Sequence, residues 1–148
     1  QPTVWAQQYH PLTRQPVPAR NYEMIALSTG ESAPVLAFLM QQDRSDPRIV
    51  RAVEAGARWY ADHAITGMAW RRVSDSAGRQ LVAEPEAGPI WARFYSVETG
   101  QPIFGDRDLT IHDDVNEISL ERRNGYGWFN SSGTVVARDV AAWRQAAR

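Results

Sequence analysis

The segment from Trp91 to Phe129 limits the chain to folds with short elements and long loops, because no helical or strand period continues through it. Turn signals interrupt it repeatedly, and arginines alternate with aromatic residues. Guanidinium groups suit bidentate capture of carboxylates or phosphates, and aromatic faces suit sugar rings or bases. The same residues also fit a small aromatic core under a solvated surface. The arginines are Arg93, Arg107, Arg122 and Arg123, and the aromatic residues include Trp91, Phe94, Tyr95, Phe104, Tyr126 and Trp128.

Composition narrows the class of protein. The 148 residues are enough for one ordinary domain, and 43% of them are hydrophobic. The formal net charge is −1, so the chain has no strongly basic face of the kind that binds nucleic acid. No apolar run approaches the roughly 18 residues of a membrane span. The absence of cysteine excludes disulfides and thiolate zinc sites. We therefore expect no nucleic-acid partner and no membrane partner.

The first half of the chain predicts an irregular lead-in followed by two helices. Residues 1–21 contain four prolines and no helical period. Ser28 and Glu31 have the spacing of a capping box, which predicts a helix that begins at residue 28 or 30 and ends near residue 42. Asp46 and Pro47 suit the N-cap and first position of a second helix, which extends to about residue 63. A short connection makes the pair an αα-hairpin.

The second half predicts short elements and one more helix. Residues 68–73 and 80–83 are expected to form a hairpin around a five-residue loop, and residues 90–95 a strand that carries Arg93. Short extended pieces are expected at 103–104 and 109–111, a short helix from residue 113 or 114 to 121, and a final helix from 134 to about 146. The predicted fold class is mainly α with short β-strands and long loops.

The histidines and acidic residues give little evidence by themselves for a metal or catalytic site. His10, His63 and His112 are far apart and match no metal-ligand spacing. Four aspartates between residues 106 and 114 resemble a calcium loop in density, but they lack its spacing and its closing glutamate. They are expected to pair with Arg107 or to cap turns. No metal site is therefore predicted in this chain. Glu23 lies close to Arg20 and is expected to orient or neutralise it.

Several ordered motifs resemble one known family. They are residues 91–95 (WARFY), 102–108 (PIFGDRD) and 121–129 (ERRNGYGWF), preceded by 3–5 (TVW), 19–24 (ARNYEM) and 27–32 (LSTGES). Together they resemble family-10 polysaccharide lyases, the pectate lyases of the (α/α)₃-toroid type. The resemblance extends over nearly the whole chain but covers only roughly the C-terminal half of that family's catalytic module. Residues 1–148 are therefore expected to be a single unit that partners the N-terminal half.

The resemblance implies calcium-assisted β-elimination on de-esterified polygalacturonate, in a secreted or periplasmic protein. Arg20 matches the position held to be the base, and Arg93 and Arg107 match positions that hold substrate carboxylates. Arg122 and Arg123 lie in a matching motif that does not show which one faces the cleft. Arg123, Tyr95 and Tyr126 are taken as further substrate-binding candidates. The calcium ligands of the family are expected mostly outside this chain, so this segment alone is expected to be inactive.

Two departures from the family pattern affect particular sites. The chain has Tyr9 and His10 where the family commonly has a His-Asp pair, and the sequence after Phe129 differs from the usual continuation. The first departure bears on substrate or metal contacts near residues 8–10, and the second on one rim of the cleft. An alternative function therefore stays open, in which the chain binds pectate through its arginine and aromatic surface without cleaving it.

Overall fold

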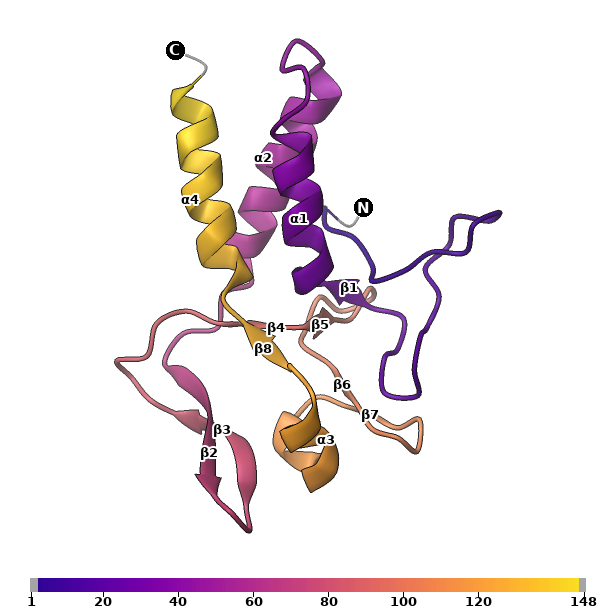
Figure 1. Ribbon diagram of the computed structural model, residues 1–148, viewed down its shortest axis with the longest axis vertical. Coiled ribbons are helices and arrows are strands. Elements are labelled where there is room, and N and C mark those ends of the chain that lie inside the picture. Colours follow the sequence, from indigo (N-terminus) through magenta and orange to yellow (C-terminus); the bar gives the residue numbers. More distant parts are fainter. Residues whose placement is uncertain (1–2, 147–148) are drawn as a thin grey trace.

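The computed structural model describes residues 3–146, which form a layer of three helices above a group of short strands and a small helix (Figure 1). The layer consists of α1 (Thr29–Leu39), α2 (Pro47–Asp62) and α4 (Ser132–Gln145), each of which packs against the other two. α1 and α4 run in one direction and α2 in the other (Figure 1). The predicted αα-hairpin and final helix are therefore present, and the mainly α fold class is confirmed.

Local chemistry explains why α2 begins and packs where it does. The side chain of Asp46 accepts a hydrogen bond from the backbone N–H of Arg48, and Pro47 occupies the first turn, where its missing N–H is not needed. The buried face includes Val53 and Tyr60. Gly56 lies against Leu36 of α1, where an added Cβ would come within 2.6 Å of the leucine side chain. The absence of a side chain at Gly56 therefore allows α1 and α2 to approach closely.

α1 begins as predicted but ends earlier, at Leu39 rather than near residue 42. Ser28 is its N-cap, yet the Ser28 hydroxyl contacts the Glu31 carboxylate and does not accept a hydrogen bond from the first turn. Neither hydrogen bond of the predicted capping box is therefore formed, since the N–H of Ser28 donates to the Trp5 carbonyl. This difference leaves the other carboxylate oxygen of Glu31 free to bind a partner outside the helix.

The lower half contains a hairpin that α3 holds in place. β2 (Met68–Ser74) pairs with β3 (Gly78–Ala83), and Ser74 lies opposite Gly78, so the loop has three residues rather than the predicted five. Gly78 has a φ of 64°, a conformation that suits glycine at this tight turn. The side chain of Asn124 in α3 (Leu120–Gly125) accepts from the N–H of Arg79. The hairpin is thus fixed against α3.

Central strands connect the two halves, and Arg93 lies where one of them changes partner. β4 (Trp91–Ala92) pairs with β8 (Phe129–Asn130), and β5 (Phe94–Tyr95) pairs with β1 (Leu27–Ser28). The N–H of Arg93 donates to the carbonyl of Trp128, whereas its carbonyl accepts from the N–H of Thr29. The single strand predicted at 90–95 is therefore interrupted. A second short pair, β6 (Phe104–Gly105) with β7 (Ile111–His112), follows.

The short helix predicted at residues 113 or 114 to 121 is instead two separate turns. The first is a 3₁₀ turn, η1 (Val115–Glu117), capped by Asp114, and the second is α3, capped by Ser119. Asp106 accepts hydrogen bonds from both the N–H and the hydroxyl of Ser119. This pairing holds the chain extended between the two turns, which explains why no continuous helix forms.

The core extends from between the three helices to the strands beneath them, and it is rich in aromatic residues. Trp128 and Phe94 are fully buried, and Trp91 is nearly so. Gly133, at the start of α4, lies so close to the Trp91 ring that an added Cβ would come within 2.2 Å of it. Many of the aromatic residues of the 91–129 segment therefore pack the core, and Arg122 is buried with them, whereas Arg107 lies at the surface. Among residues 3–146, no helix is long and apolar enough to cross a membrane.

Candidate functional site

Arg20 lies on the irregular loop that precedes β1, and Glu23 holds its side chain in a fixed direction. Nε of Arg20 donates to one carboxylate oxygen of Glu23 at 2.8 Å, and Nη2 donates to the other at 2.6 Å. The Arg20 side chain is 63% exposed, whereas that of Glu23 is 1% exposed. Among the described residues, none accepts a hydrogen bond from Nη1 of Arg20. The buried Glu23 carboxylate therefore fixes two nitrogens of the Arg20 guanidinium and leaves Nη1 available to solvent.

Glu23 is a buried carboxylate that several groups stabilise in its charged form. Besides Arg20, it accepts hydrogen bonds from the Tyr126 hydroxyl at 2.6 Å and from the Gln7 amide. The hydrogen bonds from Arg20 outweigh desolvation and lower the pKa of Glu23 to about 2. The same ion pair raises the pKa of Arg20 above its already high ordinary value. Burial, together with the bond to the Glu23 carboxylate, raises the pKa of Tyr126.

Two tyrosine rings connect Arg20 to other arginines that are far away in the sequence. The Tyr22 and Tyr126 rings meet edge to face, with centroids 5.0 Å apart. The Arg20 guanidinium lies 5.2 Å from the Tyr22 centroid and 5.7 Å from the Tyr126 centroid. Two more arginines make cation–π contacts with these rings. The guanidinium of Arg93 lies 5.0 Å from the Tyr126 centroid, and that of Arg122 lies 4.2 Å from the Tyr22 centroid. Arg107 lies 5.4 Å from the Tyr22 centroid. We call this group the arginine–tyrosine cluster: Arg20, Tyr22, Arg93, Arg107, Arg122 and Tyr126.

Each arginine of the cluster has an acidic partner. Nη2 of Arg93 donates to Glu31 at 2.8 Å, and Arg107 donates through Nε and Nη2 to the two oxygens of Glu121 at 2.9 and 3.0 Å. Arg122 also donates to Glu121 through Nε and Nη2. The bonds from Arg122 and Arg107 lower the pKa of Glu121. The four arginines face three glutamates, so the cluster with its partners has a net charge of +1.

Two predicted substrate-binding residues have other roles in the structure. Arg123 donates to the backbone carbonyls of Ile118, Ala77 and Arg79, and so connects α3 to the hairpin. Tyr95 is only 1% exposed, and its hydroxyl donates to the His63 carbonyl. Burial of Tyr95 raises its pKa to about 12. These contacts support structural roles for both residues and give no support to the predicted contact with substrate.

The structure shows two acidic partners whose role the sequence did not reveal. Glu31 was interpreted only as part of a capping box, and its use by Arg93, 62 positions later, leaves no local pattern. Glu121 lies next to Arg122, but its pairing with Arg107 depends on the bend between η1 and α3. The Arg20–Glu23 pair, by contrast, was identified because the two residues are three positions apart.

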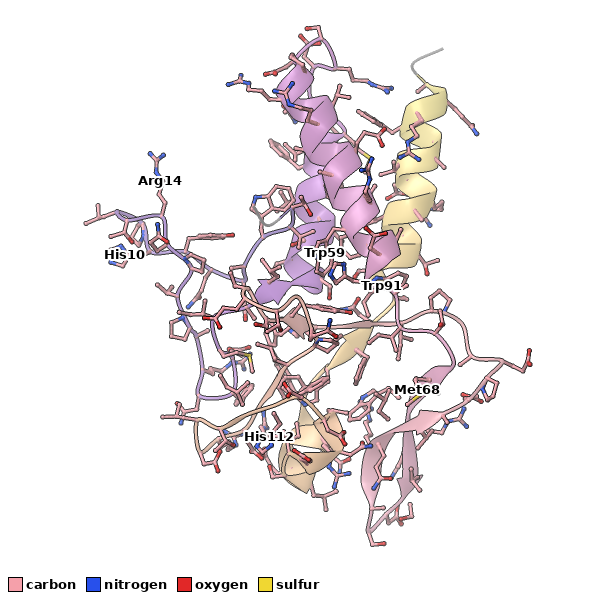
Figure 2. The ribbon with its side chains drawn as sticks, turned by 180° about the vertical axis from the view of Figure 1, so that it is seen from behind. His10, Arg14, Trp59, Met68, Trp91 and His112 are labelled. Carbon is pink, nitrogen blue, oxygen red and sulfur yellow. The ribbon has the colours of Figure 1, made fainter. Side chains whose placement is uncertain are left out.

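The described residues do not supply a metal centre. Among residues 3–146, no group of three or more His, Cys, Asp or Glu side chains could hold a metal ion. His10 lies on the loop that projects from the body and His112 lies in the lower half (Figure 2), so the histidines do not converge. Asp106 and Asp114 stabilise turns, as expected of the aspartates in this segment. The donor set within this part of the chain does not fit calcium.

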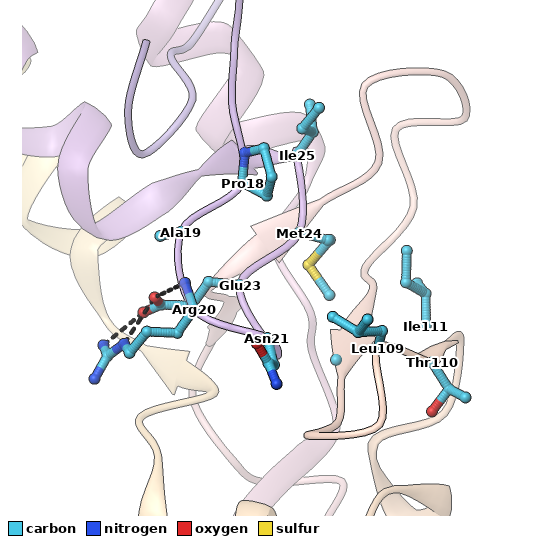
Figure 3. A pocket seen from close by; sticks show the side chains of 11 residues that line it. Pro18, Ala19, Arg20, Asn21, Glu23, Met24, Ile25, Leu109, Thr110 and Ile111 are labelled. Carbon is cyan, nitrogen blue, oxygen red and sulfur yellow. Dashed lines mark hydrogen bonds and ion pairs between the residues drawn. The ribbon is translucent and has the colours of Figure 1, made fainter. Parts of the chain in front are cut away.

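A hollow of about 400 Å³ borders the loop that carries Arg20 (Figure 3). Met24, Ile25 and Leu109 give it an apolar wall. The guanidinium of Arg20 points away from Leu109 and Ile111 (Figure 3). Arg20 therefore lines the hollow, but its guanidinium is directed away from the apolar wall.

Arg20 and Arg107 form the exposed part of the arginine–tyrosine cluster, Arg93 is partly exposed, and Arg122 and Tyr22 are buried. Each guanidinium keeps donors beyond those used by its glutamate, and Arg binds carboxylates in a bidentate manner. Tyr126 is partly exposed between the cations, whereas Tyr22 is buried beneath them. Several cations around a solvent-facing guanidinium favour an anionic ligand.

Comparison with known proteins identifies the family. The pectic acid lyase family model matches residues 1–137, so the chain belongs to that family. A solved family 10 polysaccharide lyase from Cellvibrio cellulosa is 36% identical, with a TM-score of 0.86 over 95% of this chain. A mutant of a family 10 polysaccharide lyase from the same organism, solved in complex with trigalacturonic acid, is also 36% identical, with a TM-score of 0.84 over 94% of this chain. No curated protein sequence matches the chain.

The chain spans less than half of these solved structures. It covers 43% of each Cellvibrio chain. The resemblance to family-10 polysaccharide lyases inferred from the motifs is therefore confirmed, and so is its partial extent.

Proposed function

We propose that the chain supplies the arginine-lined part of a pectate lyase site, which cleaves de-esterified polygalacturonate by β-elimination with Arg20 as the base. The observation that carries the proposal is the convergence of Arg20, Arg93, Arg107 and Arg122 around Tyr22 and Tyr126. The relative solved with trigalacturonic acid supports an acidic oligosaccharide as the ligand of this cluster. Because pectate is an extracellular polymer, a secreted or periplasmic location forms part of the proposal.

The chemistry explains why several cations would surround one exposed guanidinium. In β-elimination the base removes the C5 proton of a galacturonate, which is α to the carboxylate, and the C4–O4 bond breaks with its electron pair leaving on O4. Negative charge builds up on the carboxylate as the proton leaves. Preorganised donors near that carboxylate stabilise the transition state. We assign this role to Arg93 and Arg107, and Arg122 supports Arg107 through their shared Glu121.

Arg20 is exposed, but its ion pair favours a protonation state that opposes proton abstraction. Glu23 fixes Nε and Nη2, which leaves Nη1 as the atom available to a substrate. The ion pair also raises the pKa of Arg20 and so favours the charged form, and a charged guanidinium cannot accept a proton. Only alkaline pH acts in the opposite sense, because it increases the neutral fraction of the guanidinium. The proposal therefore requires a rate that increases with pH through the alkaline range.

Calcium belongs to the proposed reaction through the family resemblance, and its ligands are expected mostly outside this chain. The described residues hold no suitable donor cluster. Every role assigned above therefore belongs to the chain's own arginines, glutamates and tyrosines.

The second candidate function is pectate binding without cleavage. The ion pair between Arg20 and Glu23 favours it, because a protonated Arg20 captures carboxylates but does not remove protons. This function predicts retention on polygalacturonate that falls as salt increases.

The test measures absorbance of the unsaturated uronide product. The complete module that contains this chain is incubated with polygalacturonate and calcium at alkaline pH. The lyase proposal expects product formation and a decrease of about 10²–10⁴-fold in rate for Arg20→Ala, the usual contribution of a general base. Absence of product, or an unchanged rate in Arg20→Ala, contradicts it. Salt-sensitive retention without product supports the binding function instead.

A further inference from the structure

We propose that the hollow beside Arg20 accepts a methyl-esterified galacturonate unit next to the charged unit that the arginine–tyrosine cluster binds, so that the site prefers sparsely esterified pectate. The proposal rests on the proposed function, because it takes the cluster as the carboxylate-binding part of the site. The hollow lies between the loop that carries Arg20 and the turn at residues 106–110 (Figure 3). It is continuous with the cluster through Arg20, which belongs to both.

Large aliphatic side chains are exposed around the hollow. Ile25 is 47% exposed, Leu109 is 70% exposed and Ile111 is 57% exposed. The partly buried Met24 completes the apolar wall. Exposed apolar side chains that gather around a concave surface are typical of ligand-binding grooves, whereas single ones scattered over a surface need no explanation. The hollow therefore suits an apolar group and not a hydrated charge.

Leu109 lies in this wall with an unfavourable backbone conformation. Its φ is 69°, in the left-handed region that leucine rarely adopts and that glycine or asparagine adopts more readily. The turn fixes this conformation, because the N–H of Leu109 donates to the Asp106 carbonyl and the N–H of Asp106 donates to the Thr110 carbonyl. A large apolar side chain that is both strained and exposed contributes little to folding. Its presence therefore favours a role in ligand binding.

Among the described residues that line the hollow, the charged groups leave no cation free for a carboxylate. Arg20 and Glu23 are paired with each other, and the guanidinium of Arg20 is directed away from the apolar wall (Figure 3). Thr110 donates its hydroxyl to the Asp108 carboxylate at 2.6 Å, which places a negative charge beside the hollow. A carboxylate in the hollow would therefore lose hydration without gaining a partner, whereas its methyl ester is uncharged and has an apolar group to bury.

A partly esterified galacturonan satisfies both regions of the surface. Its free carboxylates suit the guanidinium groups of the cluster, and its methyl ester on a neighbouring sugar unit suits the apolar wall. The two loops that form the hollow are joined by backbone contact at Gly105 and by the hydrogen bond from Asn21 to the Arg107 carbonyl. The hollow is therefore a preformed part of the surface, as ligand sites usually are.

The first experiment compares the three mono-methyl esters of trigalacturonic acid, which have the same charge and differ only in the position of the ester. Their Kd values are measured by NMR titration of residues 1–148. We expect one isomer to bind about fourfold more tightly than each of the others, the effect of burying one methyl group. In Leu109→Asn the Kd values should converge, and the fold should be kept because asparagine suits the positive φ. Leu12→Asn is the control, because Leu12 is 86% exposed on a different segment and should leave the preference unchanged.

The second experiment locates the ester group of the favoured isomer. We expect intermolecular NOEs between the ester methyl protons and the side-chain methyl groups of Leu109 and Ile111. Equal Kd values for the isomers, a preference that persists in Leu109→Asn, or the absence of these NOEs overturns the proposal. Self-association of the chain in sedimentation velocity that Leu109→Asn abolishes also overturns it, because a second copy would then cover the hollow.

Unesterified trigalacturonic acid distinguishes failure of this proposal from failure of the proposed function. If the acid binds, Arg93→Ala abolishes its binding and the esters are equivalent, the cluster retains its ligand and only the role of the hollow is wrong. If neither the acid nor any ester binds, the proposed function fails together with the role of the hollow. Neither measurement needs pectate cleavage.

Discussion

The hydroxyl of Tyr126 donates a hydrogen bond of 2.6 Å to the buried carboxylate of Glu23, across 103 positions of sequence. This hydrogen bond connects the motif at residues 121–129 to the loop that carries Arg20. It also means that the direction of Arg20 depends on a residue at the other end of the chain.

Tyr126→Phe is expected to destabilise the protein by about 1.5–3 kcal/mol, because it removes a hydrogen bond to a charged, buried group. Urea unfolding measures the change. Tyr9→Phe is the matched control, since the Tyr9 hydroxyl accepts a hydrogen bond from the neutral N–H of Ala6 and its loss should cost about 0.5–1.5 kcal/mol. Equal losses in the two variants would show that the charge of Glu23 contributes nothing to the Tyr126 contact.

Glu23 should make stability depend on pH in the acid range. Its folded-state pKa of about 2 lies below the ordinary value of 4.5, so folding favours the ionised carboxylate. The stabilisation is therefore complete above about pH 4.5 and is lost as the pH falls through that value toward about 2. Comparing the denaturation midpoints of the unsubstituted chain and Glu23→Gln between pH 2 and pH 7 measures it. The gap between the two proteins should narrow toward pH 2, and a gap that is constant with pH contradicts the assignment.

Arg93 and Arg123 should respond differently to substitution, although both lie in the same segment. Arg93→Ala is expected to abolish salt-sensitive retention on polygalacturonate and to leave the fold intact, because its partner Glu31 remains partly exposed. Arg123→Ala should lower the free energy of unfolding by about 1–3 kcal/mol, because carbonyls of the hairpin and of Ile118 lose their donor. Arg123→Ala should retain binding.

Affinity electrophoresis in gels that contain polygalacturonate, combined with urea unfolding, separates the two effects. Arg138→Ala is the control for loss of charge, because Arg138 is 73% exposed on α4 and pairs only with Asp139 among the described residues. Loss of binding in Arg123→Ala with normal stability would restore the role in substrate binding that the motif suggested for it.

Gly133→Ala should be strongly destabilising, because its Cβ would lie 2.2 Å from the Trp91 ring. Overpacking of this kind costs about 1–3 kcal/mol and forces the ring or α4 to move. Gly127→Ala is the matched control, since a Cβ there meets nothing within 4 Å and its φ is not positive. Thermal unfolding monitored by circular dichroism compares them. Similar melting temperatures for the two variants would contradict the close packing of α4 against Trp91.

The sequence predicted those parts of the fold that depend on local signals. Asp46 and Pro47 marked the start of α2 because an N-cap acts within one turn, and two short strand-like runs on either side of residues 74–78 predicted the hairpin. The break at Arg93 was missed, because it arises from a change of partner between β8 and β1 and not from any property of residue 93. The split between η1 and α3 was missed for a similar reason, since it depends on Asp106 binding Ser119 from 13 positions away.

The sequence predicted those residues of the candidate site that occupy positions in the family motifs. Arg20, Arg93, Arg107 and Tyr126 do lie in one cluster, and Arg20 with Glu23 formed the expected pair. The choice between Arg122 and Arg123 could not be made from adjacent positions, because it depends on which face of a six-residue helix meets Tyr22. Tyr95 carried no sign in the sequence that its ring would be enclosed by Trp59 and His63.

Gly105 allows direct backbone contact between two segments of the site, because it has no side chain. An added Cβ there would come within 2.4 Å of the Tyr22 carbonyl oxygen, so the main chains of two loops touch directly. One loop carries Arg20 and the other leads to Arg107, whose own carbonyl accepts a hydrogen bond from Asn21. The spacing between the two guanidinium groups is therefore set by backbone contact as well as by rotamers. If the cluster binds pectate as proposed, this backbone contact makes binding depend on the interval between successive carboxylates of the polymer.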